Sequence, residues 1–122
     1  MKKIIIAAMV AAVSATPALA ADVKIGTLLG YTGPIESLTP DMAAGAELAM
    51  KEVTDSGTFM GGSSVTSVRG DSTCIDSAAA TATAERLITS DKVKAIMGAD
   101  CSGVTTAILQ NVAMAKGIVM IS

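Results

Sequence analysis

Histidine is absent from the 122 residues of this chain, and the aromatic residues are limited to Tyr31 and Phe59. Without histidine, the chain cannot build Ser-His triads, imidazole general bases or His-ligated metal sites. Two aromatic side chains do not make a platform on which nucleic-acid bases stack. The 9 basic and 11 acidic residues include no basic run that would contact phosphates. These absences argue against nucleic acid as a partner and close most of the usual routes to catalysis.

The first 20 residues have the pattern of a secretory signal peptide. Two lysines precede an apolar run at residues 4–13, and Ala18-Leu19-Ala20 supplies the small residues of a cleavage site. The run is shorter than the roughly 20 apolar residues that cross a membrane, although a retained N-terminal anchor is the alternative. We therefore predict a signal peptide at residues 1–20 and an exported, periplasmic domain at residues 21–122.

Two cysteines, Cys74 and Cys101, are present in the chain. In an oxidising compartment such a pair is more often bridged than free. Their spacing excludes a CxxC redox site, and a zinc ion needs about four ligands, which the chain does not offer. We expect a disulfide and no metal or cofactor. Two buried, unpaired thiols are the alternative.

Four apolar segments have the character of strands, at residues 22–29, 65–68, 93–97 and 118–121. Helical patterns separate them, so strand and helix alternate along the chain. This alternation predicts an α/β fold: a parallel sheet with helices on both faces and right-handed crossovers. The chain ends within the fourth strand, which leads us to expect an incomplete lobe from a longer protein.

Each predicted helix begins at a residue that can cap it. Thr39 precedes Pro40 at the first start, Asp76 or Ser77 stands at the second, and Ser102 at the third. Helical spacing also predicts which residues face the core. These are Met42, Ala46, Ala49 and Val53 in the first helix, Ala80, Ala84 and Leu87 in the second, and Val104, Ile108, Val112 and Ala115 in the third.

Ligands of open parallel sheets bind beyond the carboxyl ends of the strands, and the loop at residues 98–103 is the most informative one there. Ser102 places a hydroxyl at a helix N-terminus, with the N–H groups of Val104 and Thr105 behind it. This arrangement suits a carboxylate or a phosphate. The alternative is that Ser102 only caps its own helix.

The chain has neither a G-x-G-x-x-G nor a Gly-Lys-Ser/Thr motif, which weakens the case for a dinucleotide enzyme.

Four segments together resemble the N-terminal, Rossmann-like lobe of type I periplasmic binding proteins, in particular the leucine/isoleucine/valine-binding type that serves ABC importers. They are Val23-Lys24-Ile25-Gly26, Thr32-Gly33-Pro34, residues 41–49 and residues 98–105. The resemblance covers nearly all of residues 22–122 and rests on the order and spacing of these segments. It implies a two-lobed receptor that closes around a small solute and delivers it to an inner-membrane permease.

The resemblance also implies site residues. In the family, the serine after the third strand binds the α-carboxylate of the ligand, and that position is Ser102 here. The cysteine before it, Cys101, pairs with a cysteine after the second strand, which matches Cys74 and agrees with the disulfide expected from export. Leu38 takes the position of a wall residue that is often aromatic in the family. The ligand-binding residues that we expect are therefore Leu38, Cys101, Ser102, Gly103 and Thr105.

These observations favour the exported substrate-binding component of an ABC importer, which binds a branched-chain or related amino acid, or an amide, without catalysis. A sensory ligand-binding domain of the same fold is one alternative. An exported α/β enzyme is another, which would need a nucleophile or a pair of acids, and Asp71 and Asp100 are only loosely paired in sequence. The tripeptide Arg69-Gly70-Asp71 matches an adhesion motif, which we interpret as chance.

Overall fold

A four-stranded parallel sheet organises the chain in the computed structural model, which describes residues 20–122. Its strands lie in the order β2-β1-β3-β4. All three pairs of neighbours are parallel, and the first pair keeps one register from Asp22 opposite Ser64 to Leu29 opposite Asp71. The predicted signal peptide lies outside the described residues apart from Ala20. The strands are β1 (Asp22–Leu29), β2 (Ser64–Asp71), β3 (Ala95–Gly98) and β4 (Val119–Ile121).

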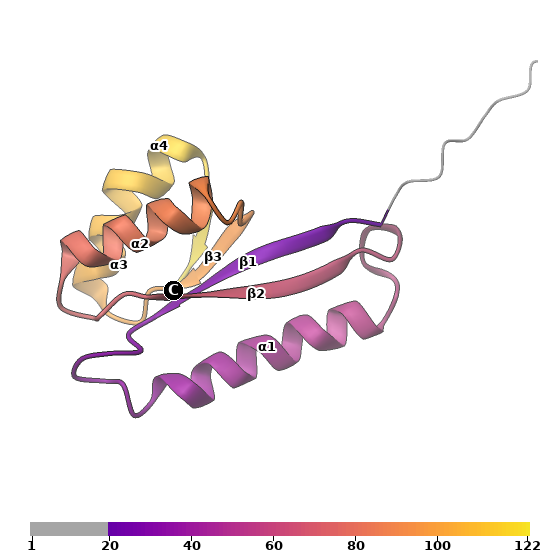
Figure 1. The fold of residues 1–122 in the computed structure, drawn as a ribbon, viewed down its shortest axis with the longest axis horizontal. Helices are drawn as coiled ribbons and strands as arrows, with labels where there is room; N and C mark the ends of the chain where they lie inside the picture. Colours follow the sequence, from indigo (N-terminus) through magenta and orange to yellow (C-terminus); the bar gives the residue numbers. More distant parts are fainter. Residues whose placement is uncertain (1–19) are drawn as a thin grey trace, which may run out of the picture.

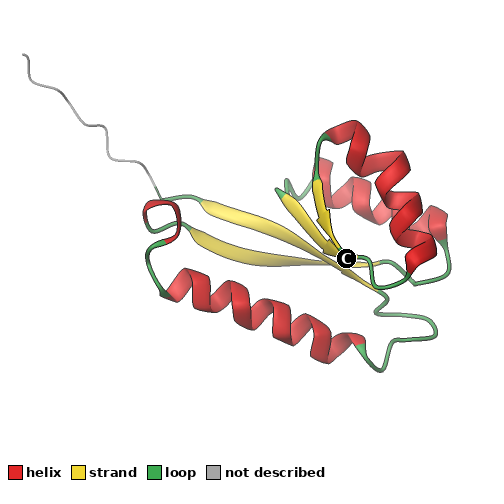
Figure 2. Ribbon diagram, turned by 180° about the vertical axis from the view of Figure 1, so that it is seen from behind, coloured by secondary structure: helices red, strands yellow, loops and turns green. Residues whose placement is uncertain are grey.

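Helices cover both faces of this sheet, as predicted (Figure 1). On one face α1 (Thr39–Asp55) runs along β1 and β2, and the 3-10 turn η1 (Phe59–Gly61) leads from it into β2. On the other face lie α2 (Ser77–Thr89) and a helix made of three parts (Figure 2). Those parts are α3 (Ser102–Ile108), the π-helical turn η2 (Leu109–Ala113) and α4 (Met114–Lys116). No helix among residues 20–122 combines the length and apolar character that a bilayer crossing requires.

The main core lies between the sheet and the α2–α3 layer. Leu28 of β1 and Ile96 of β3 meet the inward face of α2 there. The three residues predicted for that face are fully buried, which confirms the prediction: Ala80, Ala84 and Leu87. Because two of them are alanines, α2 approaches the sheet closely. An ideal Cβ on Gly70 of β2 would stand only 2.9 Å from Leu87 Cδ1, so the strand residue below the helix has no room for a side chain.

The predicted inward face of α1 is wrong for three of its four residues, and the fourth, Ala46, is half-buried. Met42 and Val53 are 44% and 40% exposed, and Ala49 is exposed as well, whereas Thr39 and Ala43 are buried. Apolar residues occur nearly all round this helix, so periodicity alone does not select one stripe. Thr39 is also the first residue of the helix rather than its cap, since Leu38 stands at the N-cap.

Polar contacts to β2 orient α1 instead. The Thr54 hydroxyl accepts a hydrogen bond from the N–H of Val65 at 2.8 Å and lies 3.2 Å from the carbonyl oxygen of the same residue. Nearer the start of α1, the Glu47 carboxylate receives both hydrogen bonds of the Arg69 guanidinium. Both contacts hold α1 in the orientation in which the face that carries Ala43 meets the sheet and Met42 lies outside.

The third predicted helix forms with one change of phase. Val104, Ile108 and Val112 are buried as expected, but Ala115 is exposed and Ala113 is buried in its place. The π-helical turn η2 explains this difference, because its wider hydrogen-bonded ring takes up one extra residue and rotates the following turn.

Candidate functional site

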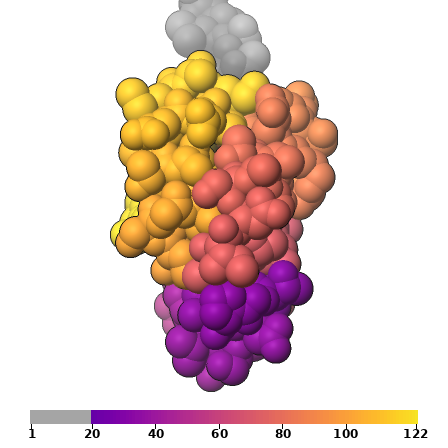
Figure 3. Space-filling model, turned by 90° about the vertical axis from the view of Figure 1, so that its left-hand side faces the viewer, coloured from indigo at the N-terminus to yellow at the C-terminus, as the bar shows by residue number. Residues whose placement is uncertain are grey.

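Three loops meet at the carboxyl edge of the sheet, where the sequence places a binding site (Figure 3). The indigo segment after β1 lies there directly beside the salmon start of α2 and the orange to yellow α3. The Asp100 carboxylate connects them, since the Gly30 N–H donates to Oδ2 at 2.7 Å and the Ser72 hydroxyl donates to Oδ1 at 3.2 Å. The predicted disulfide between Cys74 and Cys101 is present and joins the loops after β2 and β3.

Ser102 is the first residue of α3, not its cap, which corrects the prediction. Cys101 occupies the N-cap position in an extended conformation and makes no side-chain capping bond. The Ser102 side chain is exposed, and its hydroxyl has no hydrogen-bond partner among residues 20–122. Helix capping therefore does not account for this hydroxyl. The N–H groups of Gly103 and Val104 lie in the same first turn, where a helix has no acceptors of its own.

Thr105 has no free donor in this arrangement. Its N–H donates to the Cys101 carbonyl at 3.0 Å and closes the first turn of α3. Its hydroxyl lies 3.0 Å from the carbonyl oxygens of both Ala99 and Cys101. This differs from the expectation that the Thr105 N–H faces an anion, and it gives the residue a part in holding the loop that precedes Ser102.

Leu38 lies at the N-terminal end of α1, which points to the same carboxyl edge because α1 runs antiparallel to the strands (Figure 1). Its side chain is 60% exposed. An apolar side chain of this size loses water contact when a ligand or another part of a protein covers it. The structure thus leaves Leu38 available at the edge that carries Ser102.

The Asp71 carboxylate holds the loop after β1, a contact that the sequence did not suggest. It accepts hydrogen bonds from the Thr32 hydroxyl at 2.6 Å and from the N–H of Thr73 at 2.8 Å. Burial raises the pKa of Asp71, but these hydrogen bonds outweigh burial, so its pKa lies below the ordinary value. The two carboxylates thus accept hydrogen bonds from different residues. Asp71 accepts from Thr32 and Thr73, and Asp100 accepts from Gly30 and Ser72.

Arg69 joins α1 to the start of the first loop. Its guanidinium makes a two-pronged ion pair with Glu47, with N–O distances of 2.6 and 2.8 Å, and its Cζ lies 5.6 Å from the centre of the Tyr31 ring. The Arg69 hydrogen bond lowers the pKa of Glu47. Burial raises the pKa of Tyr31, whose hydroxyl is buried and unpartnered among residues 20–122. Since Gly70 is buried within β2, the Arg69-Gly70-Asp71 tripeptide is part of the sheet.

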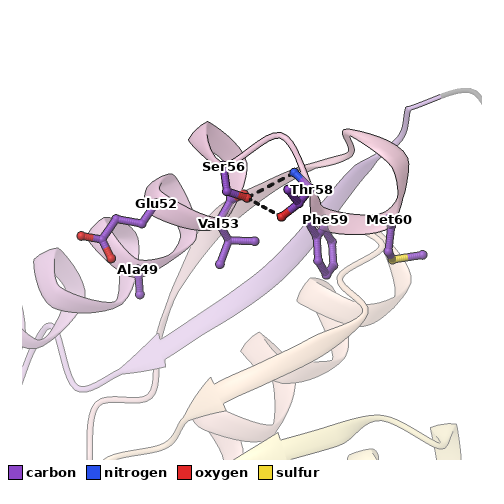
Figure 4. Close-up of a pocket in the computed structure, with 7 residues that line it drawn as sticks. All are labelled: Ala49, Glu52, Val53, Ser56, Thr58, Phe59 and Met60. Atoms are coloured by element: carbon purple, nitrogen blue, oxygen red, sulfur yellow. Dashed lines mark hydrogen bonds between the residues drawn. The ribbon is translucent and has the colours of Figure 1, made fainter.

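A shallow groove lies at the opposite, amino-terminal edge of the sheet, between the end of α1 and η1 (Figure 4). Ser56 and Thr58 in its wall are hydrogen-bonded to each other. It shares no residue with the three loops around Asp100. The residues lining the groove are Ala49, Glu52, Val53, Ser56, Thr58, Phe59 and Met60.

Among residues 20–122, no group of three or more His, Cys, Asp or Glu gathers where it could hold a metal ion.

The sequence and the structure of the chain are similar to those of known binding proteins. The sequence profile described as periplasmic binding protein matches residues 22–122. The chain belongs to the periplasmic binding protein family. Its sequence is 38% identical over 111 residues to the Leu/Ile/Val-binding protein homolog 7 of Brucella abortus. The match covers 90% of this chain and 27% of the Brucella protein, so the chain spans about a quarter of the length of that relative.

Solved structures of substrate-binding proteins of transporters have the same fold. The branched-chain amino acid transporter substrate-binding protein LivJ of Streptococcus pneumoniae, solved with isoleucine, matches with a TM-score of 0.73 and 30% identity, over 83% of this chain and 28% of LivJ. A solute-binding protein of an ABC transporter from Rhodopseudomonas palustris, solved with benzoate, matches with a TM-score of 0.67 and 30% identity, over 81% and 26%. The predicted resemblance to this type of periplasmic binding protein is confirmed.

Proposed function

We propose that this chain is part of the exported substrate-binding component of an ABC importer, and that Ser102 binds the carboxylate of its ligand. The observation that carries the proposal is the free hydroxyl of Ser102. It is exposed at the first turn of α3 and unused among residues 20–122, beside loops that the Cys74–Cys101 disulfide and Asp100 hold together. A hydroxyl with free N–H groups behind it at the positive end of a helix favours an anion.

A carboxylate is the group that the ligands of the two relatives share, since isoleucine and benzoate have little else in common. This supports carboxylate recognition at the site. The similarity to a Leu/Ile/Val-binding protein homolog and to isoleucine-bound LivJ favours a branched-chain or related amino acid as the ligand. In this proposal Ser102 and the N–H of Gly103 bind the carboxylate, and Cys101 supplies the adjoining backbone. Leu38 contacts the apolar side chain of the ligand from the end of α1.

In this proposal the chain forms part of one lobe of the receptor. Because the chain spans about a quarter of the length of its relatives, we propose that a second lobe closes over the ligand and removes it from water. The closed receptor then releases the ligand to an inner-membrane permease. The relatives named here are binding proteins, and two of them belong to transporters, which favours an importer component over an enzyme or a sensor.

An NMR titration of the purified, ¹⁵N-labelled chain tests the binding site. Isoleucine and benzoate are expected to shift the amide resonances of Ser102 and Gly103, whereas isoleucinol, which lacks the carboxylate, leaves them in place. Ser102→Ala should weaken binding by about 5- to 150-fold, the range for the loss of a charge-assisted hydrogen bond of about 1–3 kcal/mol. Ser77→Ala is the matched control, because Ser77 is also the exposed first residue of a helix. Equal shifts with isoleucinol, or unchanged affinity of Ser102→Ala, would contradict the proposal.

Export is tested separately by the mass of the mature chain. When the full chain is expressed in a Gram-negative host, we expect the protein in the periplasmic fraction to begin at Ala21. A chain that keeps residues 1–20 and stays with the membrane fraction would contradict the proposed periplasmic location.

A further inference from the structure

Asp100 ties the ends of three strands together immediately before the segment that carries Ser102. It follows β3, and its carboxylate receives the N–H of Gly30 at the end of β1 and the hydroxyl of Ser72 at the end of β2. Gly30 lies 70 residues away in sequence and Ser72 lies 28 residues away. One side chain therefore fixes the positions of the loops after β1 and β2 relative to the third.

Both donors depend on this carboxylate. Gly30 is buried, and Ser72 is completely buried. A buried donor that loses its acceptor costs about 1–3 kcal/mol, so the arrangement is strongly preferred over one in which Asp100 turns outward.

The backbone on either side of Asp100 is held as well. The Ala99 carbonyl accepts hydrogen bonds from the Ser122 hydroxyl at 2.7 Å and from the Thr105 hydroxyl at 3.0 Å. Cys101 is fixed by its disulfide to Cys74. The next residue, Ser102, has a hydroxyl with no partner in the described part of the chain. The backbone that carries that hydroxyl is thus held by the anchored segment before it.

We propose that Asp100 is a positioning residue of the Ser102 site: it aligns the Ser102 hydroxyl with the loops after β1 and β2 before a ligand arrives. This inference rests on the proposed function of Ser102. A site that is already aligned does not spend binding free energy on ordering its loops, so its affinity is higher. Asp100 itself does not contact the ligand in this arrangement, because both of its oxygens are turned to Gly30 and Ser72.

Asparagine at this position separates hydrogen bonding from charge. The Asn oxygen can accept from the Gly30 N–H, and its NH₂ group can donate to the Ser72 hydroxyl, which accepts as readily as it donates. Asp100→Asn therefore keeps both connections and removes the negative charge. Asp100→Ala removes both connections, and Ser72→Ala removes only the one to the end of β2.

Affinity for isoleucine or benzoate, measured by NMR titration of the purified chain, tests the inference together with the amide exchange rate of Gly30. Asp100→Ala should weaken binding about tenfold, because about 1.4 kcal/mol of the binding free energy would then be spent on ordering the loops, and should shift the Ser102 amide resonance in the free chain. Asp100→Asn should bind within about threefold of the wild type, and Ser72→Ala should fall between the two variants. Wild-type affinity in Asp100→Ala, or equal losses in the Asn and Ala variants, would overturn the inference.

The Gly30 amide distinguishes this failure from a failure of the proposed function. If the wild-type chain binds neither ligand, the proposed function fails. The hydrogen bond is still tested, because the Gly30 amide should exchange faster in Asp100→Ala than in Asp100→Asn. If Asp100→Ala does not fold, Ser72→Ala and Asp100→Asn still decide the outcome: binding by Ser72→Ala as tight as that of the wild type overturns the inference.

Discussion

Cys74 and Cys101 form a disulfide between the ends of β2 and β3, with their Cα atoms 5.2 Å apart and 27 residues of sequence separation. A bridge that closes a loop of this length reduces the entropy of the unfolded chain. Replacing both cysteines with serine should therefore lower the free energy of unfolding by about 3–4 kcal/mol. Urea denaturation of the purified chain measures this difference.

Reduction of the wild-type chain is the control for the cysteine variants. The sequence contains no other cysteine, so dithiothreitol should lower the wild-type urea midpoint to that of the double variant and leave the double variant unchanged. A wild-type midpoint that does not respond to reduction would show that the bridge contributes nothing to stability.

The lowered pKa of Asp71 predicts a loss of stability in acid. In the unfolded chain this carboxyl has a pKa of about 3.9, and in the folded chain the hydrogen bonds from Thr32 and Thr73 place it lower. A carboxylate of this kind stabilises the fold above the unfolded pKa, and its contribution disappears as the pH falls through the folded pKa. Asp71→Asn has similar shape but does not titrate. We therefore expect the wild type to exceed this variant in unfolding free energy by a constant amount above about pH 5, and by less toward pH 2.

The comparison between the two proteins isolates Asp71. The pKa of Glu47 is also lowered, but Glu47 is present in both proteins, so its contribution cancels in the difference. Chemical denaturation at a series of pH values provides the measurement. A difference that stays constant down to pH 2 would mean that these hydrogen bonds do not lower the pKa of Asp71.

Two glycines are expected to respond to alanine with opposite signs. An ideal Cβ on Gly70 would stand 2.8 Å from Thr83 Cγ2 and 2.9 Å from Leu87 Cδ1, so Gly70→Ala should destabilise the chain by about 1–3 kcal/mol through overpacking. Gly45 lies in α1 with nothing within 4 Å of such an atom, and Gly45→Ala should stabilise the helix by about 1 kcal/mol. Urea midpoints of the two variants test this. A stable Gly70→Ala variant would contradict the close approach of α2 to β2.

The sequence was sufficient to predict the buried face of α2 but not that of α1. In α2 helical spacing alone predicts the buried face of Ala80, Ala84 and Leu87, although Ala78 and Ala82 are apolar and exposed. In α1 apolar residues occur on several sides, so hydrogen bonds made by Thr54 and Glu47 decide the orientation. Those bonds depend on how a helix and a strand are placed in space, which local periodicity does not contain.

Strand ends were harder to predict than strands. The second strand was expected at residues 65–68 and runs from Ser64 to Asp71, because pairing with β1 in one register extends it through polar residues. Ser102 was expected as a cap and is the first helical residue, a shift of one position that follows from the extended conformation of Cys101. The bridge made by Asp100 joins positions 70 residues apart, so that no local pattern in the sequence indicates it.

Two adjacent threonines of α3 provide a last test of what holds the Ser102 segment. The Thr105 hydroxyl lies 3.0 Å from the carbonyl oxygens of Ala99 and Cys101, whereas the exposed Thr106 hydroxyl donates to the Ser102 carbonyl within the helix. Thr105→Val should lower the free energy of unfolding by about 1 kcal/mol, the usual net value of a hydrogen bond, and Thr106→Val by less than about 0.5 kcal/mol, as for an exposed position. The two variants make the same change of atoms one residue apart, so the helix propensity of valine cancels. Equal losses in the two urea midpoints would mean that the contact from α3 to the Ala99–Cys101 loop adds nothing beyond the helix itself.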